Sequence, residues 1–562
     1  MKARRPAALL AISLLAAVFG LFVLYPLGAT VAESLSEEGK FSLAHYRFLF
    51  DLSNRVNLEA VGNSVYVSVI SVLLSGVLGL FLAFVFTQYR FPLRGVLARL
   101  AVLPVALPPL VGVIAFLFVF GPTGIIPRGL QLLVRSSAPV LPAGGMGGVI
   151  LVHVYSFHVY FYLFVSAALG RLDASQIEAA TGLGGTAWRT FVRIVLPELK
   201  PGLLAASALT FMSSMASFTA PLLFAGGEHF ITLQIYASKL NGDLDLAAAQ
   251  SVLLTGVSLG FYLLLSLGPA RNAAYARKGS AAPGILMPGK AVRRIMIALA
   301  FTILGIELLP VSAIVALSLA REGSWTTEWL PSAYTLLNYT SFFSDPSLLE
   351  PVVNSLEMAF LALAASLAFG VTAAFLVSRR RGRLFGLWAN VTLTLPYAVP
   401  GTVIAIALIL AFNRPVLAGV PALLVGTFWI LPLAYFVREY PVVIRSVGAS
   451  LEGMDGSLLE AASGLGAGPF RSFRTVAFPI LLPGIISGGV LVLIGSLGEF
   501  VSSILLYTYA SRPISVEILA QLRLFNIGSA AAYSVILMLI ILVLLRLTGP
   551  LLASEGRMSY IL

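Results

Sequence analysis

The chain has 562 residues, of which 59% are hydrophobic and 11% are charged, and its formal net charge is +12. A soluble domain has about 25% charged and about 45–50% apolar residues, so the composition excludes an ordinary soluble protein. Cysteine is absent, which excludes disulfide scaffolds, thiolate metal sites and cysteine nucleophiles. Basic residues gather in the cytoplasmic loops of membrane proteins, so the positive charge needs no nucleic-acid partner, and we expect none.

The apolar residues fall in blocks of roughly 20, the length at which a helix crosses a hydrocarbon core about 30 Å thick. Backbone groups in lipid must bond within the protein, so we predict an all-α membrane protein with about twelve transmembrane helices. The first apolar block is longer than the hydrophobic region of a signal peptide, so we expect a retained anchor. The predicted spans lie near 7–31, 62–87, 100–120, 147–169, 201–225, 249–269, 295–320, 353–378, 390–411, 421–440, 484–507 and 530–549.

The basic residues predict the orientation. With the N-terminus inside, 26 of the 36 lysines and arginines fall on the inner side of the predicted spans. This inner group includes Arg438 and Arg445, at the end of the tenth predicted span. Because cytoplasmic loops are enriched in such residues, we predict a multi-pass protein of the inner (plasma) membrane with both termini in the cytoplasm.

The chain is an internal duplication. The segment "VGNSVYVSVI" at 61–70 matches "VVNSLEMAFL" at 352–361, and "LPVALPPLVGVIA" at 103–115 matches "LPYAVPGTVIAIA" at 395–407. Each half has six spans in the same orientation, so we predict two parallel repeats related by an axis along the membrane normal. The predicted domains are a first repeat at 1–269, a cytoplasmic linker at 270–294 and a second repeat at 295–562. The two long cytoplasmic loops lie near 171–200 and 441–482.

These two loops contain the same pattern. The first reads "EAATGLGGTAWRTFVRIVLPELKPG" at 178–202, and the second reads "EAASGLGAGPFRSFRTVAFPILLPG" at 460–484. We predict a short helix, a turn that glycine permits, a second amphipathic helix and a proline at the return to the membrane. The apolar stripe of the second helix needs a cover, which can be the bilayer interface, the helical bundle or a partner.

The paired loops resemble the EAA coupling loops of binding-protein-dependent ABC importer permeases. The family pattern is EAA, three residues, glycine, nine residues and then I-x-L-P. The second copy keeps the spacing but has Val and Phe where the first has Ile and Leu. The matching positions are Glu178, Ala179, Ala180, Gly184, Ile194 and Pro197 in the first loop, and Glu460, Ala461, Ala462, Gly466, Val476 and Pro479 in the second.

The resemblance implies a type I importer permease in which each loop docks on an ATPase subunit. Two loops imply two copies of that subunit, and a periplasmic or lipid-anchored binding protein would deliver the substrate. The chain has no phosphate-binding G-x-x-x-x-G-K-[ST] loop, so we expect no catalytic residues, no metal and no cofactor on this chain. ATP and magnesium would bind to the partner ATPases.

Ionisable residues inside a span are costly and point to function. Glu499 lies well inside the predicted span 484–507, and its repeat equivalent is Ser217. We predict that both lie on the translocation pathway, although hydrogen bonding between helices would also explain Glu499. Pro104 and Pro396 are expected either to bend spans near the pathway or to mark helix starts.

The substrate is not determined by these motifs. The segments at 217–227 and 498–518 most resemble the permeases of iron(III) importers, so ferric iron is the first hypothesis. Thiamine, sulfate, polyamine and phosphonate permeases remain alternatives. A different class, the ion-coupled secondary transporters, also contains paired six-helix halves, but it leaves the duplicated cytoplasmic loops unexplained.

Overall fold

The computed structural model describes residues 4–37, 39–266, 289–325, 328–378, 392–393, 395–413, 423–455 and 457–553. Within these ranges the chain is almost entirely helical, and its one strand pair joins β1 (Ser36–Glu37) to β2 (Lys40–Phe41). The predicted linker 270–294 lies outside the described residues up to residue 288.

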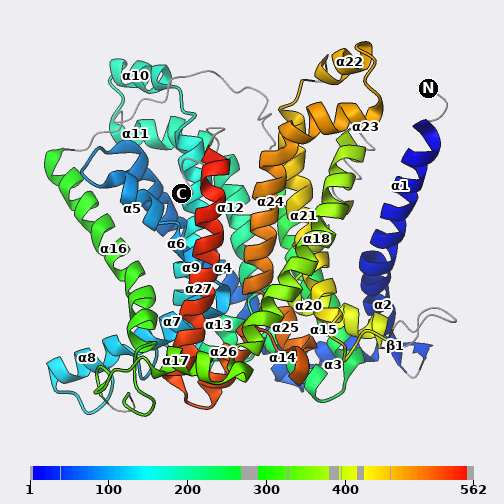
Figure 1. Ribbon diagram of the computed structural model, residues 1–562. Helices are drawn as coiled ribbons and strands as arrows, with labels where there is room; N and C mark the ends of the chain where they lie inside the picture. Colours follow the sequence, from blue (N-terminus) through cyan, green and yellow to red (C-terminus); the bar gives the residue numbers. More distant parts are fainter. Residues whose placement is uncertain are drawn as a thin grey trace.

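The first half forms a bundle of long helices joined by short ones (Figure 1). Its helices are α1 (Arg4–Phe19), a π-helical turn (Gly20–Leu24), α2 (Tyr25–Ser34), α3 (Ala44–Leu49), α4 (Arg55–Gln88), α5 (Arg94–Leu100), α6 (Leu103–Ala106), α7 (Pro109–Phe120), α8 (Ile125–Val134), α9 (Gly145–Leu169), α10 (Ala174–Gly182), α11 (Ala187–Thr190), a π-helical turn (Phe191–Val195), α12 (Leu196–Met215), α13 (Thr219–Phe224), α14 (Ile231–Leu240) and α15 (Leu244–Ser266).

The second half repeats this order of elements. Its helices are α16 (Lys290–Leu317), α17 (Leu337–Ser344), a 3₁₀ turn (Pro346–Leu348), α18 (Glu350–Ser378), α20 (Gly401–Phe412), α21 (Ile430–Glu452), α22 (Ser457–Gly464), α23 (Pro469–Ser472), a π-helical turn (Phe473–Ala477), α24 (Phe478–Gly498), α25 (Val501–Leu506), a 3₁₀ turn (Tyr509–Ser511), α26 (Ile514–Arg523) and α27 (Ile527–Ala553).

The spans agree with the predicted membrane protein, with two corrections. Ten helical stretches of the described chain are long and apolar enough to cross a membrane. The ninth predicted span corresponds to α20, which has only 12 residues. The tenth, predicted at 421–440, is displaced: α21 begins at Ile430 and continues to Glu452. Charged residues within α21 lower its hydropathy, so a search for apolar segments does not detect the second half of this helix.

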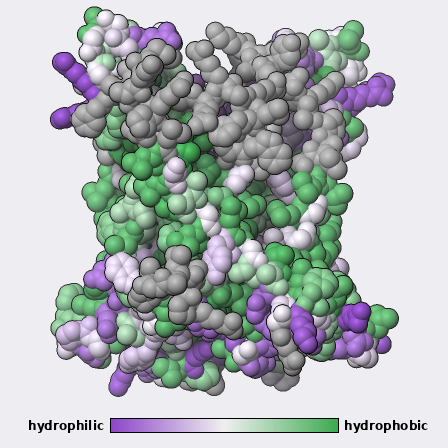
Figure 2. Space-filling view, turned by 90° about the vertical axis from the view of Figure 1, so that its right-hand side faces the viewer, coloured by the Kyte–Doolittle hydropathy of each residue, from purple (hydrophilic) through white to green (hydrophobic). Residues whose placement is uncertain are grey.

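The two halves are parallel, as the duplication predicts. α10 and α22 both lie at the upper end in Figure 1, the end at which α1 begins. α14 and α26 both lie at the lower end. Figure 2 shows hydrophobic residues across the middle of this face and most of its hydrophilic residues toward the two ends, as expected of a chain that crosses a bilayer.

Each half packs its first helix against the other half. α1 and α2 contact α18 and α20 of the second repeat, whereas α16 contacts α4, α5 and α7 of the first repeat. Figure 1 shows α1 standing beside α18 at one side of the bundle and α16 beside α5 at the other. These contacts hold the two repeats against each other.

The repeated Asn-Ser pair has a structural role at the lower end. The side-chain amide of Asn63 donates to the carbonyl of His229 at 3.1 Å, and the hydroxyl of Ser64 accepts from the backbone N–H of Ile231 at 3.1 Å. The second repeat forms the equivalent bonds, from Asn354 to the carbonyl of Arg512 at 3.2 Å and from the N–H of Ile514 to Ser355 at 2.7 Å. The pair therefore fixes the first turns of α14 and α26.

Two repeat-equivalent glycines permit close helix crossings. A Cβ added at Gly79 in α4 would lie 2.5 Å from Cβ of Phe161 in α9, and one at Gly370 in α18 would lie 2.7 Å from Cβ of Val443 in α21. We expect Gly79→Ala and Gly370→Ala each to destabilise the protein by about 1–3 kcal/mol through overpacking. Thermal unfolding of the purified protein in detergent measures this.

The matched control is Gly62→Ala, also in α4, where an added Cβ would meet no atom within 4 Å. Helix propensity predicts that this change stabilises the helix by up to about 1 kcal/mol. Equal melting temperatures for the changes at positions 62 and 79 would contradict the close crossing.

Candidate functional site

The first EAA segment is a helix–turn–helix at the upper end of the molecule. A side-chain oxygen of Asp173 accepts from the backbone N–H of Ser175 at 3.0 Å and caps α10. After α10 ends, Gly184 adopts a φ of +77°, a left-handed conformation that only glycine enters without strain. α11 and a π-helical turn follow, and Pro197 lies in the first turn of α12.

The second segment repeats this geometry. Asp455 accepts from the backbone N–H of Ser457 at 2.9 Å, at the start of α22. Hydrogen bonds from Ser457 lower the pKa of Asp455, so the carboxylate keeps them at neutral pH and loses them only as the pH falls through that lowered pKa. Gly466 has a φ of +78°. The two loops thus have the same backbone conformation at this turn, although their side chains differ.

The predicted motif residues occupy equivalent surroundings in the two loops. Glu178, Ala179, Gly184 and Pro197 are exposed, and so are Glu460, Ala461, Gly466 and Pro479. Ala180, Ile194, Ala462 and Val476 are partly buried. The predicted coupling loop at 441–482 is corrected at its start, because α21 continues to Glu452.

A matched pair of leucines marks the tips of these loops. Leu183 is 90% exposed and Leu465 is 89% exposed, and each directly precedes the left-handed glycine. The sequence-based interpretation did not single them out, although their equal position in the two motifs was a usable signal. Each loop tip therefore presents an exposed apolar side chain that a partner protein can cover.

The predicted spans at 201–225 and 484–507 are not continuous helices. α12 ends at Met215 and α13 begins at Thr219, whereas α24 ends at Gly498 and α25 begins at Val501. Ser217 therefore lies in a break between helices, and so does Glu499, whose φ and ψ are −70° and 115°. Hydropathy averages over these breaks and does not reveal them.

The carbonyl groups that the breaks expose are satisfied in the same way in both halves. The hydroxyl of Thr232 in α14 donates to the carbonyl of Ser217 at 2.8 Å. The hydroxyl of Ser515 in α26 donates to the carbonyl of Glu499 at 2.9 Å, and that of Ser503 donates to the same carbonyl at 2.7 Å. Non-helical backbone at membrane depth is stable only with such partners.

The two breaks meet at the centre of the molecule. Phe218 and Phe500, which directly follow Ser217 and Glu499, have ring centroids 6.0 Å apart, and each is 1% exposed. Residues at equivalent positions of two repeats can touch only near the axis that relates the repeats. The aromatic pair therefore marks that axis and forms an apolar contact between the halves, which we call the closure.

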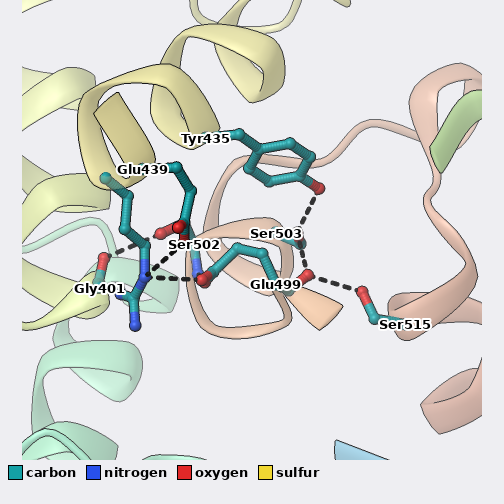
Figure 3. A network of polar contacts seen from close by, with 8 residues as sticks. Gly401, Tyr435, Glu439, Glu499, Ser502, Ser503 and Ser515 are labelled. Atoms are coloured by element: carbon teal, nitrogen blue, oxygen red, sulfur yellow. Dashed lines mark hydrogen bonds and ion pairs between the residues drawn. The ribbon is translucent and has the colours of Figure 1, made fainter. Parts of the chain in front are cut away.

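Glu499 is held by an ion pair. Oε2 of Glu499 lies 2.9 Å from Nε of Arg438 in α21, and Oε1 accepts from the backbone N–H of Ser502 at 2.8 Å (Figure 3). The hydroxyl of Ser502 donates to the carbonyl of Gly401 at 3.2 Å, and Tyr435 shares a hydrogen bond with Ser503 at 2.7 Å. The inner-loop assignment of Arg438 is therefore wrong, because its side chain lies between the helices.

A second carboxylate lies beside this ion pair. Oε1 of Glu439 is 4.0 Å from Nε of Arg438. A Cβ added at Gly495 would lie 2.6 Å from that carboxylate, so only glycine leaves room for it. Phe500, the residue after Glu499, contacts Phe218 of the first repeat. The cluster thus lies where the halves face each other.

The predicted prolines mark helix starts. Pro104 is in the first turn of α6. Pro396 precedes α20, whose N-terminal cap is Pro400. Pro396 also lines an apolar cavity together with Phe22 of the first repeat. The prolines thus interrupt the third and ninth spans, and the neighbouring Pro108 lies at the interface, where a Cβ on Gly498 would come within 3.5 Å of its Cα.

Two buried histidines of α9 take part in packing between helices. Nδ1 of His153 is 3.0 Å from the hydroxyl of Ser214 and 3.2 Å from that of Ser71. Nε2 of His158 lies 3.2 Å from Oε1 of Glu307 in α16. Glu307 thereby links the first helix of the second repeat to the first repeat.

Comparison with known proteins identifies the family. A family model described as "binding-protein-dependent transport system inner membrane component" matches residues 75–268 and again residues 366–551. A probable ABC transporter permease of Sinorhizobium fredii is 30% identical over 510 residues, covering 88% of this chain and 87% of that protein. A ferric transport system permease of Actinobacillus pleuropneumoniae is 25% identical over 536 residues, covering 93% of this chain and 75% of that protein. A probable molybdenum ABC transporter permease of Haloferax volcanii is 31% identical over 252 residues, covering 45% of this chain and 87% of that protein.

The left-handed glycines give a local test of the loop geometry. Gly184→Ala and Gly466→Ala place a Cβ in a conformation that costs about 1–2 kcal/mol, so we expect faster amide hydrogen exchange in α10 and α22 respectively. Gly182→Ala is the control, because Gly182 is the last residue of α10, where alanine favours the helix. Exchange that is unchanged at α10 in Gly184→Ala would contradict the left-handed turn.

Proposed function

The chain belongs to the family of inner membrane components of binding-protein-dependent transport systems, and we propose that it carries ferric iron into the cytoplasm. It is a fused permease: the family model matches each half once, and the two halves have the same order of elements. Permease subunits of ABC importers do not hydrolyse ATP themselves. The family therefore implies an ATPase and a substrate-binding protein as partners.

We place the upper end of the molecule in the cytoplasm. Most lysines and arginines of the sequence fall on that side of the spans, as the distribution of basic residues in membrane proteins requires. Both EAA segments also lie at that end, where ATPases have access to them. α1 begins and α27 ends there, so both termini would be cytoplasmic.

Each EAA segment docks one ATPase subunit, so one fused chain binds two copies. The observation that supports this proposal is the pair of exposed leucine tips, Leu183 and Leu465, held by identical turns. ATP and magnesium would bind between the two ATPases. Closure of the ATPases would move α10 and α22, and with them the helices that end in the central breaks.

Ferric iron is the substrate that the full-length resemblance favours. The ferric transport relative covers both halves of the chain, whereas the molybdenum relative covers fewer than half of its residues. A permease passes its substrate from the binding protein without holding it as a resident cofactor. The iron is therefore a transient cargo here.

Coupling is tested by changing both loops. In proteoliposomes with the ATPase and the binding protein, we expect Glu178→Ala combined with Glu460→Ala to lower ATP-driven uptake about tenfold or more. A lost interface contact of about 1.4 kcal/mol has that effect. Glu198→Ala is the control, since Glu198 is an exposed acid at the same end but outside the motif. Normal coupled uptake by the double variant would contradict docking at these loops.

The substrate is tested by uptake of radioactive ferric iron into cells that contain or lack the chain. We expect iron uptake to depend on the chain and to be unaffected by excess molybdate or thiamine. Chain-dependent uptake of molybdate instead of iron would refute the substrate assignment but not the importer mechanism.

A further inference from the structure

The closure at the centre is symmetric, but its support is not. Phe218 and Phe500 occupy equivalent positions, whereas the groups behind them differ between the halves. The second half has Arg438, Glu439 and Glu499, and the equivalent residues of the first half are Ser156, Phe157 and Ser217. The duplicated backbone therefore has a charged anchor in one half only.

We propose that Arg438 is a positioning residue that clamps the second break, so that Phe500 is the fixed side of the closure and Phe218 is the side that moves. The proposal rests on the permease function stated above. It assigns the two halves of one fused chain different tasks in the same transport cycle.

The geometry of the second break supports the fixed side. Both carboxylate oxygens of Glu499 are engaged, one by Arg438 and one by the N–H of Ser502, and its carbonyl accepts two further hydrogen bonds. Because Phe500 is the next residue, these contacts fix the position of its ring. Ser502 also bonds to the carbonyl of Gly401, which ties the start of α25 to the start of α20.

The burial of Glu499 strengthens the clamp. Glu499 is buried, and the side chain of Arg438 is about one-third exposed (32%), so solvent reaches only the arginine side of the pair. Charge-assisted hydrogen bonds are about twice as strong as neutral ones. Removing one partner leaves the other charge in an apolar setting, which is the costly way to break such a pair.

The first break has a weaker anchor. Among the described residues, the carbonyl of Ser217 accepts from Thr232, and no acid occupies the position of Glu499. The neighbouring contacts are neutral, between Ser68 and Ser214 at 2.9 Å and between Ser214 and His153 at 3.0 Å. The segment that carries Phe218 can therefore shift without separating opposite charges.

Amide hydrogen exchange on the whole complex in nanodiscs tests the asymmetry directly. In the unchanged protein, we expect the amides of 500–506 to exchange about tenfold more slowly than those of 218–224, because the clamped segment opens less often. Equal exchange of the two segments would overturn the proposal without any variant.

Two matched variants assign the difference to the clamp. Glu499→Gln keeps the shape of the side chain but removes its charge, and we expect it to raise exchange at 500–506 to the level of 218–224. Ser217→Ala changes the equivalent residue and should leave 218–224 unchanged. Arg438→Lys retains the positive charge but loses the planar guanidinium group. We therefore expect an intermediate exchange rate at 500–506. Unchanged exchange in Glu499→Gln would overturn the proposal.

A functional measurement separates this proposal from the proposed function. If the closure loosens, Glu499→Gln should hydrolyse ATP several-fold faster than the unchanged complex without the binding protein, and Ser217→Ala should not. If the unchanged complex shows no transport at all, the permease function fails, while hydrogen exchange still decides the clamp. If transport is normal but Glu499→Gln stays fully dependent on the binding protein, the clamp does not support the closure.

Discussion

Backbone groups inside a bilayer must find partners within the protein, and the centre of this chain is built around that requirement. Each half interrupts a membrane helix, which frees carbonyl groups from the hydrogen bonds of the helix. The hydroxyl groups of Thr232 in α14 and Ser515 in α26 donate hydrogen bonds to these carbonyl groups. These helices must then be fixed in place, which the repeated Asn-Ser pair of α4 and α18 does. The duplicated sequence motif at 61–70 and 352–361 thus holds the two helices that donate hydrogen bonds to the breaks.

The two halves share a backbone but not a charge distribution. Glycines and aromatic residues recur where the backbone needs them, at Gly184 and Gly466 and at Phe218 and Phe500. Among the described residues, the buried carboxylates lie in the second half, where Arg438 stands between two of them. Gene fusion allows such divergence, because the two halves of one chain need not pack against a second copy of themselves.

Much of the architecture could be predicted from the sequence. The apolar blocks indicated the spans, and the repeat with its EAA loops indicated the family that the comparisons confirm. The orientation that the basic residues indicate stays a prediction. The offset of 282 residues between the two EAA motifs would also have placed α21 near 430, because α9 begins at Gly145. Charged residues in α21 concealed this helix from an argument based on hydropathy alone.

The centre of the site could not be predicted in the same way. Hydropathy does not distinguish a continuous helix from two helices joined by a break, so Glu499 was placed inside a span. A positively charged residue near the end of a span indicates a cytoplasmic loop, and that rule misplaced Arg438. The contact between Phe218 and Phe500 depends on the packing of two distant segments, which no local pattern contains. Only the shared position of these residues in the repeat pointed to a common role.

In the proposed transport cycle, the two breaks meet at the axis and separate when the ATPases close. The chain contains no cysteine, so Phe218→Cys and Phe500→Cys together create one defined pair for a short thiol cross-linker. We expect efficient cross-linking of the complex in nanodiscs without nucleotide and a marked loss of cross-linking when ATP is bound. Cross-linking that is equal in both states, or absent from both, would contradict this cycle.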